Sequence, residues 1–159
     1  MSDTTLKDFP VSWNELHRDA KALAWRLVDM GPWRGIVAVA RGGLIPAAIV
    51  ARELGVRVVD TVCVRSYEHQ TRGTVEILKA PAGDGDGWLV VDDLADTGET
   101  ARAVRALLPK AHFAMVYVKP AGKPLAHTYV TEVSQDTWIH FPWDLELQFS
   151  RPIAERHGK

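Results

Sequence analysis

The chain has little cysteine, no excess of charge of either sign and no long apolar run. Its one cysteine, Cys63, has no partner for a disulfide within the chain, as is typical of proteins from reducing compartments. A formal net charge of −1 gives no global indication of binding to nucleic acid or to an anionic membrane. No apolar stretch approaches the roughly 20 residues of a membrane span, and the first residues lack the pattern of a secretory signal. These absences favour a soluble cytoplasmic protein.

The length of 159 residues predicts one domain, residues 1–159, that is large enough to bury its own core. Ser12 and Glu15 have the spacing of a helix capping box, and apolar residues then recur at intervals of three and four, which predicts a helix over 13–30. Two of the six tryptophans, Trp13 and Trp25, fall in this pattern, and we expect them in the core or at an interface.

Strand patterns and helix patterns alternate along most of the chain. Strands are predicted over 36–40, 56–64, 75–78, 88–91 and 111–118, and helices over 44–54 and 99–108. This alternation predicts an α/β fold, with a central, mostly parallel sheet flanked by helices. The core is expected over about 13–118. Residues 119–159 are irregular and rich in aromatic residues and proline, and they are expected to form a small lobe over the site.

The strongest functional signal is the segment 89–100, where three apolar residues lead into the adjacent carboxylates Asp92 and Asp93. Asp96 follows, and after it the small residues of 97–100. Carboxylates at the end of a buried strand can contact ribose hydroxyls and Mg²⁺. Backbone N–H groups and threonine hydroxyls in the next turn can surround a phosphate. In parallel sheets, ligands bind beyond the carboxyl ends of the strands, which is where this segment is expected.

Five segments together resemble the type I phosphoribosyltransferases, and most of all the bacterial purine enzymes that act on xanthine and guanine. The segments are Arg41-Gly42-Gly43, Asp60-Thr61-Val62-Cys63, 91–98, Lys119-Pro120-Ala121-Gly122 and 135–139. The resemblance implies the type I phosphoribosyltransferase fold, with a hood built from the C-terminal and N-terminal ends of the chain. It implies transfer of the 5-phosphoribosyl group from phosphoribosyl pyrophosphate (PRPP) to N9 of guanine, xanthine or, less well, hypoxanthine. The products are GMP, XMP or IMP and pyrophosphate.

The resemblance also assigns the residues that would bind PRPP. Asp92 and Asp93 would contact the ribose hydroxyls, with Asp93 also ordering Mg²⁺, and Arg41 would neutralise the leaving pyrophosphate. In the family the peptide bond after the residue corresponding to Arg41 is cis. The loop beginning at Ser66-Tyr67 would close over PRPP, and Arg72 is its candidate basic residue, although a solvated surface arginine is nearly as plausible. The PRPP-binding set is Arg41, Gly42, Arg72, Asp92, Asp93, Leu94, Ala95, Asp96, Thr97, Gly98, Glu99 and Thr100.

Four residues would bind the base. Asp96 would face N7 of the purine and share a proton with it, whereas on its residues alone it could equally cap the following helix. Lys119 would recognise the 6-oxo group, which favours an oxopurine over adenine. Trp138 would stack on the ring, and backbone carbonyls near Ile139 would meet the 2-position.

The resemblance further implies a homotetramer and a loose association with the inner face of the membrane. Two alternatives remain open. One is a phosphoribosyltransferase of different base specificity, against which Lys119 and Trp138 argue. The other is an RNA-binding regulator that keeps the fold, although the chain contains no dense cluster of Lys and Arg.

Overall fold

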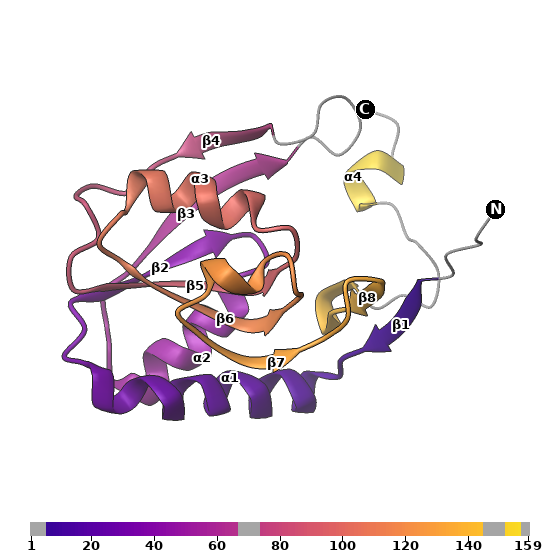
Figure 1. Cartoon of the computed structure of the whole chain (residues 1–159), viewed down its shortest axis with the longest axis horizontal. Helices are drawn as coiled ribbons and strands as arrows, with labels where there is room; N and C mark the ends of the chain where they lie inside the picture. Colours follow the sequence, from indigo (N-terminus) through magenta and orange to yellow (C-terminus); the bar gives the residue numbers. More distant parts are fainter. Residues whose placement is uncertain (1–5, 67–73, 145–151, 157–159) are drawn as a thin grey trace.

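A six-stranded sheet forms the centre of the molecule in this computed structural model, which describes residues 6–66, 74–144 and 152–156. The strand order is β4-β3-β2-β5-β6-β7, and every pair is parallel except β3 with β4 (Figure 1). Its strands are β2 (Gly35–Ala40), β3 (Val59–Ser66), β4 (Val75–Lys79), β5 (Trp88–Ala95), β6 (His112–Val118) and β7 (Thr128–Glu132). The mostly parallel α/β fold predicted from the alternating patterns is confirmed.

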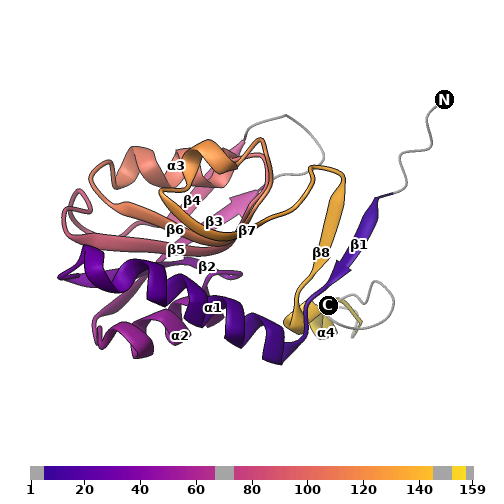
Figure 2. The ribbon, with the colours of Figure 1, turned by 60° about the horizontal axis from the view of Figure 1, so that its bottom comes forward.

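Helices cover both faces of the sheet, as Figure 2 shows. Helices α1 (Trp13–Leu27) and α2 (Leu44–Leu54) lie on one face, and α3 (Glu99–Leu107) lies on the other. Along β2, Ile36 and Ala38 pack into the core cluster beneath α1 and α2, whereas Val37 and Val39 pack beneath α3. A strand that is buried on both faces has to be apolar at every position, which explains the uninterrupted apolar run at 36–40.

Helix α1 begins at the predicted capping box. The Ser12 hydroxyl accepts a hydrogen bond from the Glu15 backbone N–H at 3.1 Å, and it also contacts the Glu15 carboxylate. The helix ends at Leu27, and a short 3₁₀ turn, η1 (Val28–Met30), covers the rest of the predicted range. Trp13 and Trp25 do not lie in the core, because they are 54% and 77% exposed. They occupy the solvent side of α1, whose buried positions are taken by leucine and alanine residues and by Asp19.

The strand predicted over 56–64 is found at Val59–Ser66, and most other predicted elements differ by one residue at one end. Strand pairing explains two further differences. Strand β5 was predicted to end at Val91 but continues to Ala95, because its ladder with β6 extends to Ala95 and Val118. The chain after residue 118 is also less irregular than expected. After the 3₁₀ turn η2 (Lys123–Leu125), strand β7 returns to pair with β6 and completes the sheet.

A separate two-stranded parallel sheet forms the hood, made by β1 (Lys7–Pro10) and β8 (Thr137–His140). Figures 1 and 2 show it beyond the end of the central sheet. Aromatic contacts attach it to the core: Tyr117 of β6 meets Phe9 and Phe141 edge-on, and Phe141 stacks on Trp143 at 4.9 Å between ring centroids. The 3₁₀ turn η3 (Pro142–Asp144) and the short helix α4 (Ile153–Arg156) follow β8. Among the described residues, no helix has the length and apolar character to cross a membrane.

Candidate active site

The candidate site lies where the direction of strand addition reverses. From β2 the chain adds β3 and β4 on one side, and then crosses over to add β5, β6 and β7 on the other. The β2–β5 ladder stops at Ala38 and Val91, whereas the β5–β6 ladder continues to Ala95. Residues 92–95 are therefore paired on one side only, and the loop after β2 packs against their free side. Ligands of open α/β sheets bind at such a switch point.

Two glycines let the loop after β2 approach β5 closely. A Cβ atom at Gly42 would lie 2.4 Å from Oδ2 of Asp93, and one at Gly43 would lie 2.5 Å from the carbonyl oxygen of Val91. A side chain at position 43 would meet backbone atoms, and one at position 42 would displace the Asp93 carboxylate, so that both positions favour glycine. The predicted diphosphate loop and the predicted ribose acids are thus in direct contact.

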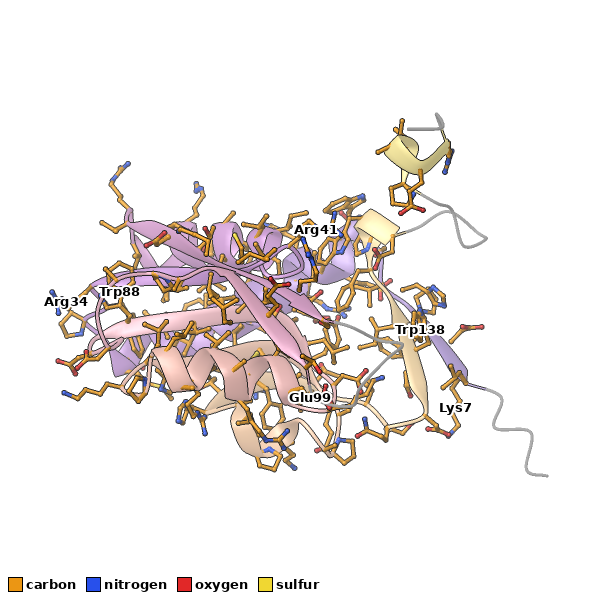
Figure 3. The ribbon with its side chains drawn as sticks, turned by 90° about the horizontal axis from the view of Figure 1, so that it is seen from above. Lys7, Arg34, Arg41, Trp88, Glu99 and Trp138 are labelled. Carbon is orange, nitrogen blue, oxygen red and sulfur yellow. The ribbon has the colours of Figure 1, made fainter. Side chains whose placement is uncertain are left out.

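Arg41 lies exposed in this loop. Figure 3 places Arg41, Glu99 and Trp138 toward the hood end of the sheet, whereas Arg34 and Trp88 mark the opposite end. The structure contains a cis non-proline peptide at Ala40–Arg41. The cis bond expected after Arg41 is therefore found one position earlier, at the junction where β2 ends and the loop begins.

Asp92 and Asp93 carry closely spaced, poorly solvated carboxyls. Asp92 is 9% exposed, and its Oδ1 accepts a hydrogen bond from the Asp93 backbone N–H at 2.8 Å. Burial raises the pKa of Asp92 well above its usual range, and the neighbouring charge of Asp93 raises it further. Burial also raises the pKa of Asp93, and the charge of Asp144 in the hood adds to that effect. The site therefore holds two acids whose charged forms are unfavourable, and a bound cation would stabilise those forms.

The turn between β5 and α3 forms a small pocket. Gly98 adopts a left-handed conformation with φ of 88°, and α3 begins at the next residue, so that its first N–H groups point out of the helix end. The backbone dipoles at this end favour an anion. The pocket is lined by Asp92, Leu94, Ala95, Asp96, Thr97, Gly98, Glu99, Thr100, Ala101 and Met115. The turn 97–100, predicted to surround a phosphate, thus lines one cavity together with residues 94–96 of the predicted PRPP-binding set.

Asp96 and Lys119, predicted from separate segments, form an ion pair. The Lys119 ammonium lies 3.0 Å from Oδ2 of Asp96, with the lysine side chain 6% exposed and the aspartate side chain 49% exposed. Their proximity follows from the β5–β6 ladder, which ends at Ala95 and Val118, the residues just before each. The backbone N–H of Lys119 also donates to the carbonyl of Ala95. Asp96 therefore does not cap α3, whose N-cap residue is Gly98.

The hood supplies the remaining predicted residues. Trp138 in β8 is 53% exposed, as a stacking surface has to be, whereas the Ile139 side chain is 7% exposed and packs into the core. Arg72 and the rest of 67–73 lie outside the described residues. Within the described residues, no group of three or more His, Cys, Asp or Glu side chains is arranged to hold a metal ion.

One polar residue that contacts this site has no role in the sequence prediction. Gln135 hydrogen-bonds to Asp96, although it lies 39 positions away along the chain. It falls within the segment 135–139 that carries part of the resemblance, but a single exposed glutamine gives no signal of its own. Asp144, whose charge acts on Asp93, was equally unmarked in the sequence.

Fold and site together define an α/β protein in which a glycine loop, an acidic strand and the glycine turn before α3 meet at the switch point of its sheet. Residues 12–150 match the family model described as phosphoribosyl transferase domain, and the chain belongs to the phosphoribosyltransferase family.

Relatives and solved structures agree with this assignment. The xanthine-guanine phosphoribosyltransferase of Desulfotalea psychrophila is 57% identical over the whole of both chains. That of Nitratidesulfovibrio vulgaris is 58% identical, over 98% of this chain and 96% of its own. Among solved structures, a purine phosphoribosyltransferase from Pyrococcus horikoshii superposes with a TM-score of 0.75 at 28% identity, covering 91% of this chain and 99% of its own.

Proposed function

We propose that this protein transfers the 5-phosphoribosyl group from PRPP to N9 of 6-oxopurines in purine salvage. The bases are guanine, xanthine and, less well, hypoxanthine, and the products are GMP, XMP or IMP and pyrophosphate. The observation that carries the proposal is the Asp96–Lys119 pair directly beside the phosphate pocket. The names of the relatives at 57% and 58% identity support the same substrates.

The PRPP end of the reaction follows from the loops at the switch point. The N–H groups and hydroxyls of 97–100 hold the 5′-phosphate, and Asp92 and Asp93 accept hydrogen bonds from the ribose hydroxyls. Arg41 and the backbone of Gly42 face the diphosphate. As the bond to pyrophosphate breaks, charge develops on the leaving oxygens and on the ribose, so that positioned charges and hydrogen bonds lower the barrier.

The base end of the reaction uses groups from both the sheet and the hood. Lys119 donates to the 6-oxo oxygen, and Asp96 accepts or shares the proton of the purine imidazole, which makes N9 a better nucleophile. Trp138 stacks on the ring. A cation at position 119 disfavours adenine, since its 6-amino group would present a donor to a donor.

Magnesium fits the charge of this site. Asp92 and Asp93 offer carboxylate oxygens whose pKa is raised by burial and also by the nearby negative charges of Asp93 and Asp144, respectively. Mg²⁺ takes one or two protein carboxylates and completes its octahedron with water and substrate oxygens, so that two acids suffice. Bound there with PRPP, Mg²⁺ would balance the charge of the leaving pyrophosphate. Asp93 is the proposed ligand, directly or through water.

The proposal includes the whole chain acting as one unit in the cytoplasm, assembled as a homotetramer and loosely associated with the inner face of the membrane. The exposed Trp13 and Trp25 on α1 offer apolar surface that assembly would cover. Light scattering at several protein concentrations would give the mass of the assembly, and flotation with anionic vesicles would measure membrane binding.

Steady-state kinetics with PRPP, Mg²⁺ and a panel of bases test the proposal. We expect turnover with guanine, xanthine and hypoxanthine, and little with adenine or pyrimidines. A preference for adenine or a pyrimidine would instead support a phosphoribosyltransferase of different specificity. No turnover with any base, together with tight RNA retention in a filter-binding assay, would support the RNA-binding regulator.

A further inference from the structure

Gln135 joins three separate segments of the site through hydrogen bonds to two residues, Asp96 and Ala121, including a longer one from its Nε2 to the Asp96 carbonyl oxygen at 3.4 Å. It lies between β7 and β8, in the segment that leads from the central sheet into the hood. Its side-chain Nε2 donates to Oδ1 of Asp96 at 2.8 Å, and its Oε1 accepts from the backbone N–H of Ala121 at 3.0 Å. Asp96 follows β5 and Ala121 follows β6, so that one side chain contacts both strand ends from the hood side.

The two contacts determine which way the amide faces. A backbone N–H can only donate, so the amide oxygen has to face Ala121, and the NH₂ group consequently faces the carboxylate. The carboxylate of Asp96 in turn can only accept from it. Rotation of the amide by 180° would place donor against donor and acceptor against acceptor, and the observed orientation is therefore the one that satisfies both partners.

The consequence for Asp96 is that both of its carboxylate oxygens are engaged. Lys119 holds Oδ2 at 3.0 Å, and Gln135 holds Oδ1 at 2.8 Å. The Asp96 side chain is 49% exposed, so that burial does little to restrain it. Two donors on opposite oxygens fix the plane of the carboxylate, and hydrogen bonds of this charge-assisted kind are stronger than neutral ones.

The same residue also sets the start of β8. Gln135 precedes Trp138 by only three positions, and the intervening turn is closed by a hydrogen bond from the Thr137 N–H to the Ser134 carbonyl. A bond from Gln135 to Asp96 therefore ties the position of the proposed stacking residue to that of the proposed proton acceptor.

We propose that Gln135 is a positioning residue for the purine base. It fixes the direction of the Asp96 carboxylate and holds the hood strand that carries Trp138 in register with it. This inference rests on the proposed function. If Gln135 only fastened the loop, the Ala121 contact would be sufficient. Its bond to Asp96 is what predicts an effect on the base and little effect on PRPP.

Replacing Gln135 with glutamate separates the two contacts. The carboxylate of Q135E still accepts from the Ala121 N–H, but it presents an unprotonated oxygen to Asp96 in place of a donor. We expect the KM for guanine to rise about tenfold or more, as for the loss of a hydrogen bond to a charged group, with the KM for PRPP within about twofold of wild type. As the pH is lowered, the introduced carboxyl binds a proton and again donates, so that kcat/KM for guanine recovers relative to wild type.

Two further variants complete the experiment. Q135M removes these hydrogen bonds at similar length, and its kcat/KM for guanine should fall without the recovery at low pH. Asp136→Asn removes a charge from the neighbouring position but keeps an amide oxygen that can accept from the Ser134 hydroxyl, as Asp136 does; Asp136 also pairs with Lys7, and the kinetics of the variant should match wild type.

The possible outcomes distinguish the inference about Gln135 from the proposed function on which it rests. Wild-type enzyme that turns over none of the oxopurines refutes the proposed function. Wild-type turnover with Q135E unchanged, or with the KM values for PRPP and guanine raised equally, overturns the role of Gln135 alone. A pH profile of Q135E that parallels wild type does the same. Lowered thermal stability in Q135E and Q135M with an unchanged ratio of the two KM values would assign Gln135 a structural role instead.

Discussion

At the scale of single residues, the site buries ionisable side chains whose burial is unfavourable for folding. The folded pKa of Asp92 lies above its unfolded value because burial and Asp93 disfavour the charged form. As the pH rises, Asp92 therefore loses its proton at a lower pH in the unfolded chain than in the folded protein. The free energy of unfolding falls as the pH rises from the unfolded pKa to the folded pKa. Each unit of pKa shift corresponds to about 1.4 kcal/mol. Neutral asparagine at this position avoids the penalty, and its side-chain oxygen can still accept from the Asp93 N–H.

We therefore expect Asp92→Asn to raise the free energy of unfolding of the ligand-free protein at pH 7, by on the order of 1 kcal/mol, while abolishing turnover. Urea unfolding at pH 7 and at pH 4 measures the effect, and the gain should shrink at pH 4, where Asp92 itself is protonated. The control is Asp84→Asn, because Lys110 lowers the pKa of that exposed carboxyl, and its loss should not stabilise the protein. A less stable Asp92→Asn would contradict the argument.

Lys119 is the second residue whose burial lowers the stability of the fold, and such burial indicates a function. It is 5% exposed, and a buried lysine needs a partner, which here is Asp96. Lys119→Met keeps the length of the side chain and removes its charge. We expect the KM for guanine and for xanthine to rise about tenfold or more, with the KM for PRPP within about twofold. Lys123→Met, which removes an exposed lysine paired with Glu132, is the control. Equal effects on both substrates would place Lys119 elsewhere in the reaction.

At the scale of elements, the start of α1 depends on a local signal, the N-cap residue Ser12. The Ser12 hydroxyl satisfies the Glu15 N–H, one of the four N–H groups that an α-helix leaves without a partner at its start. Ser12→Ala should lower the free energy of unfolding by about 1 kcal/mol. Asn14→Ala, which changes the exposed residue directly before Glu15, should have little effect. Chemical denaturation compares the two, and equal losses would mean that the cap contributes nothing.

The join between β6 and the turn before β7 depends on two neutral histidines. The Nδ1 atom of His127 accepts the Phe113 N–H at 2.8 Å, and the rings of His112 and His127 lie 5.0 Å apart. Burial lowers the pKa of His127, and the charge of Arg105 lowers it further. Burial also lowers the pKa of His112, with His127 adding to the effect. Protonation of His127 at Nδ1 would therefore break its hydrogen bond with the Phe113 N–H. Protonation of both histidines would place two positive charges close together.

Because the folded pKa of each histidine lies below the unfolded value of 6.5, their contribution to stability is present above pH 6.5 and is lost as the pH falls. His127→Ala should be less stable than wild type at pH 7.5, and the difference should narrow toward pH 5. His17→Ala, at an exposed position of α1, is the control. Thermal unfolding across this range tests the effect. A constant difference between His127→Ala and wild type would exclude titration as its cause.

At the scale of the whole molecule, the proposed base site is shared between the central sheet and the hood, so that their attachment should matter for binding. Trp143 stacks on Phe141 with ring planes only 4° apart, and it contacts Trp13 of α1 at 6.1 Å. We expect Trp143→Ala to lower stability by about 3 kcal/mol and to raise the KM for guanine more than that for PRPP. Val58→Ala, at an exposed residue before β3, is the control. Kinetics and denaturation on the same samples would show whether the two effects separate.

The extent of the sequence prediction follows from the range of the interactions involved. The start of α1, the buried strand at 36–40 and the loop at 97–100 depend on neighbours a few positions away, and each was predicted. The end of β5 was predicted at Val91 because polar residues follow, but pairing with β6 carries the strand to Ala95. Strand β1 was not predicted as a strand, because it forms only by pairing with β8, more than a hundred residues later.

The amino-acid sequence alone determined the order of the elements from α1 to β6, the glycines at 42 and 43 and the acids within β5. Each of these is a local preference of apolar spacing, backbone freedom or charge. Only the tertiary structure decided that Lys119 pairs with Asp96, that Asp93 lies against Gly42 and that Gln135 holds the carboxylate from the hood. These contacts join residues far apart in the chain. They form because the parallel ladders bring the carboxyl ends of the strands to one edge, a condition that no single segment contains.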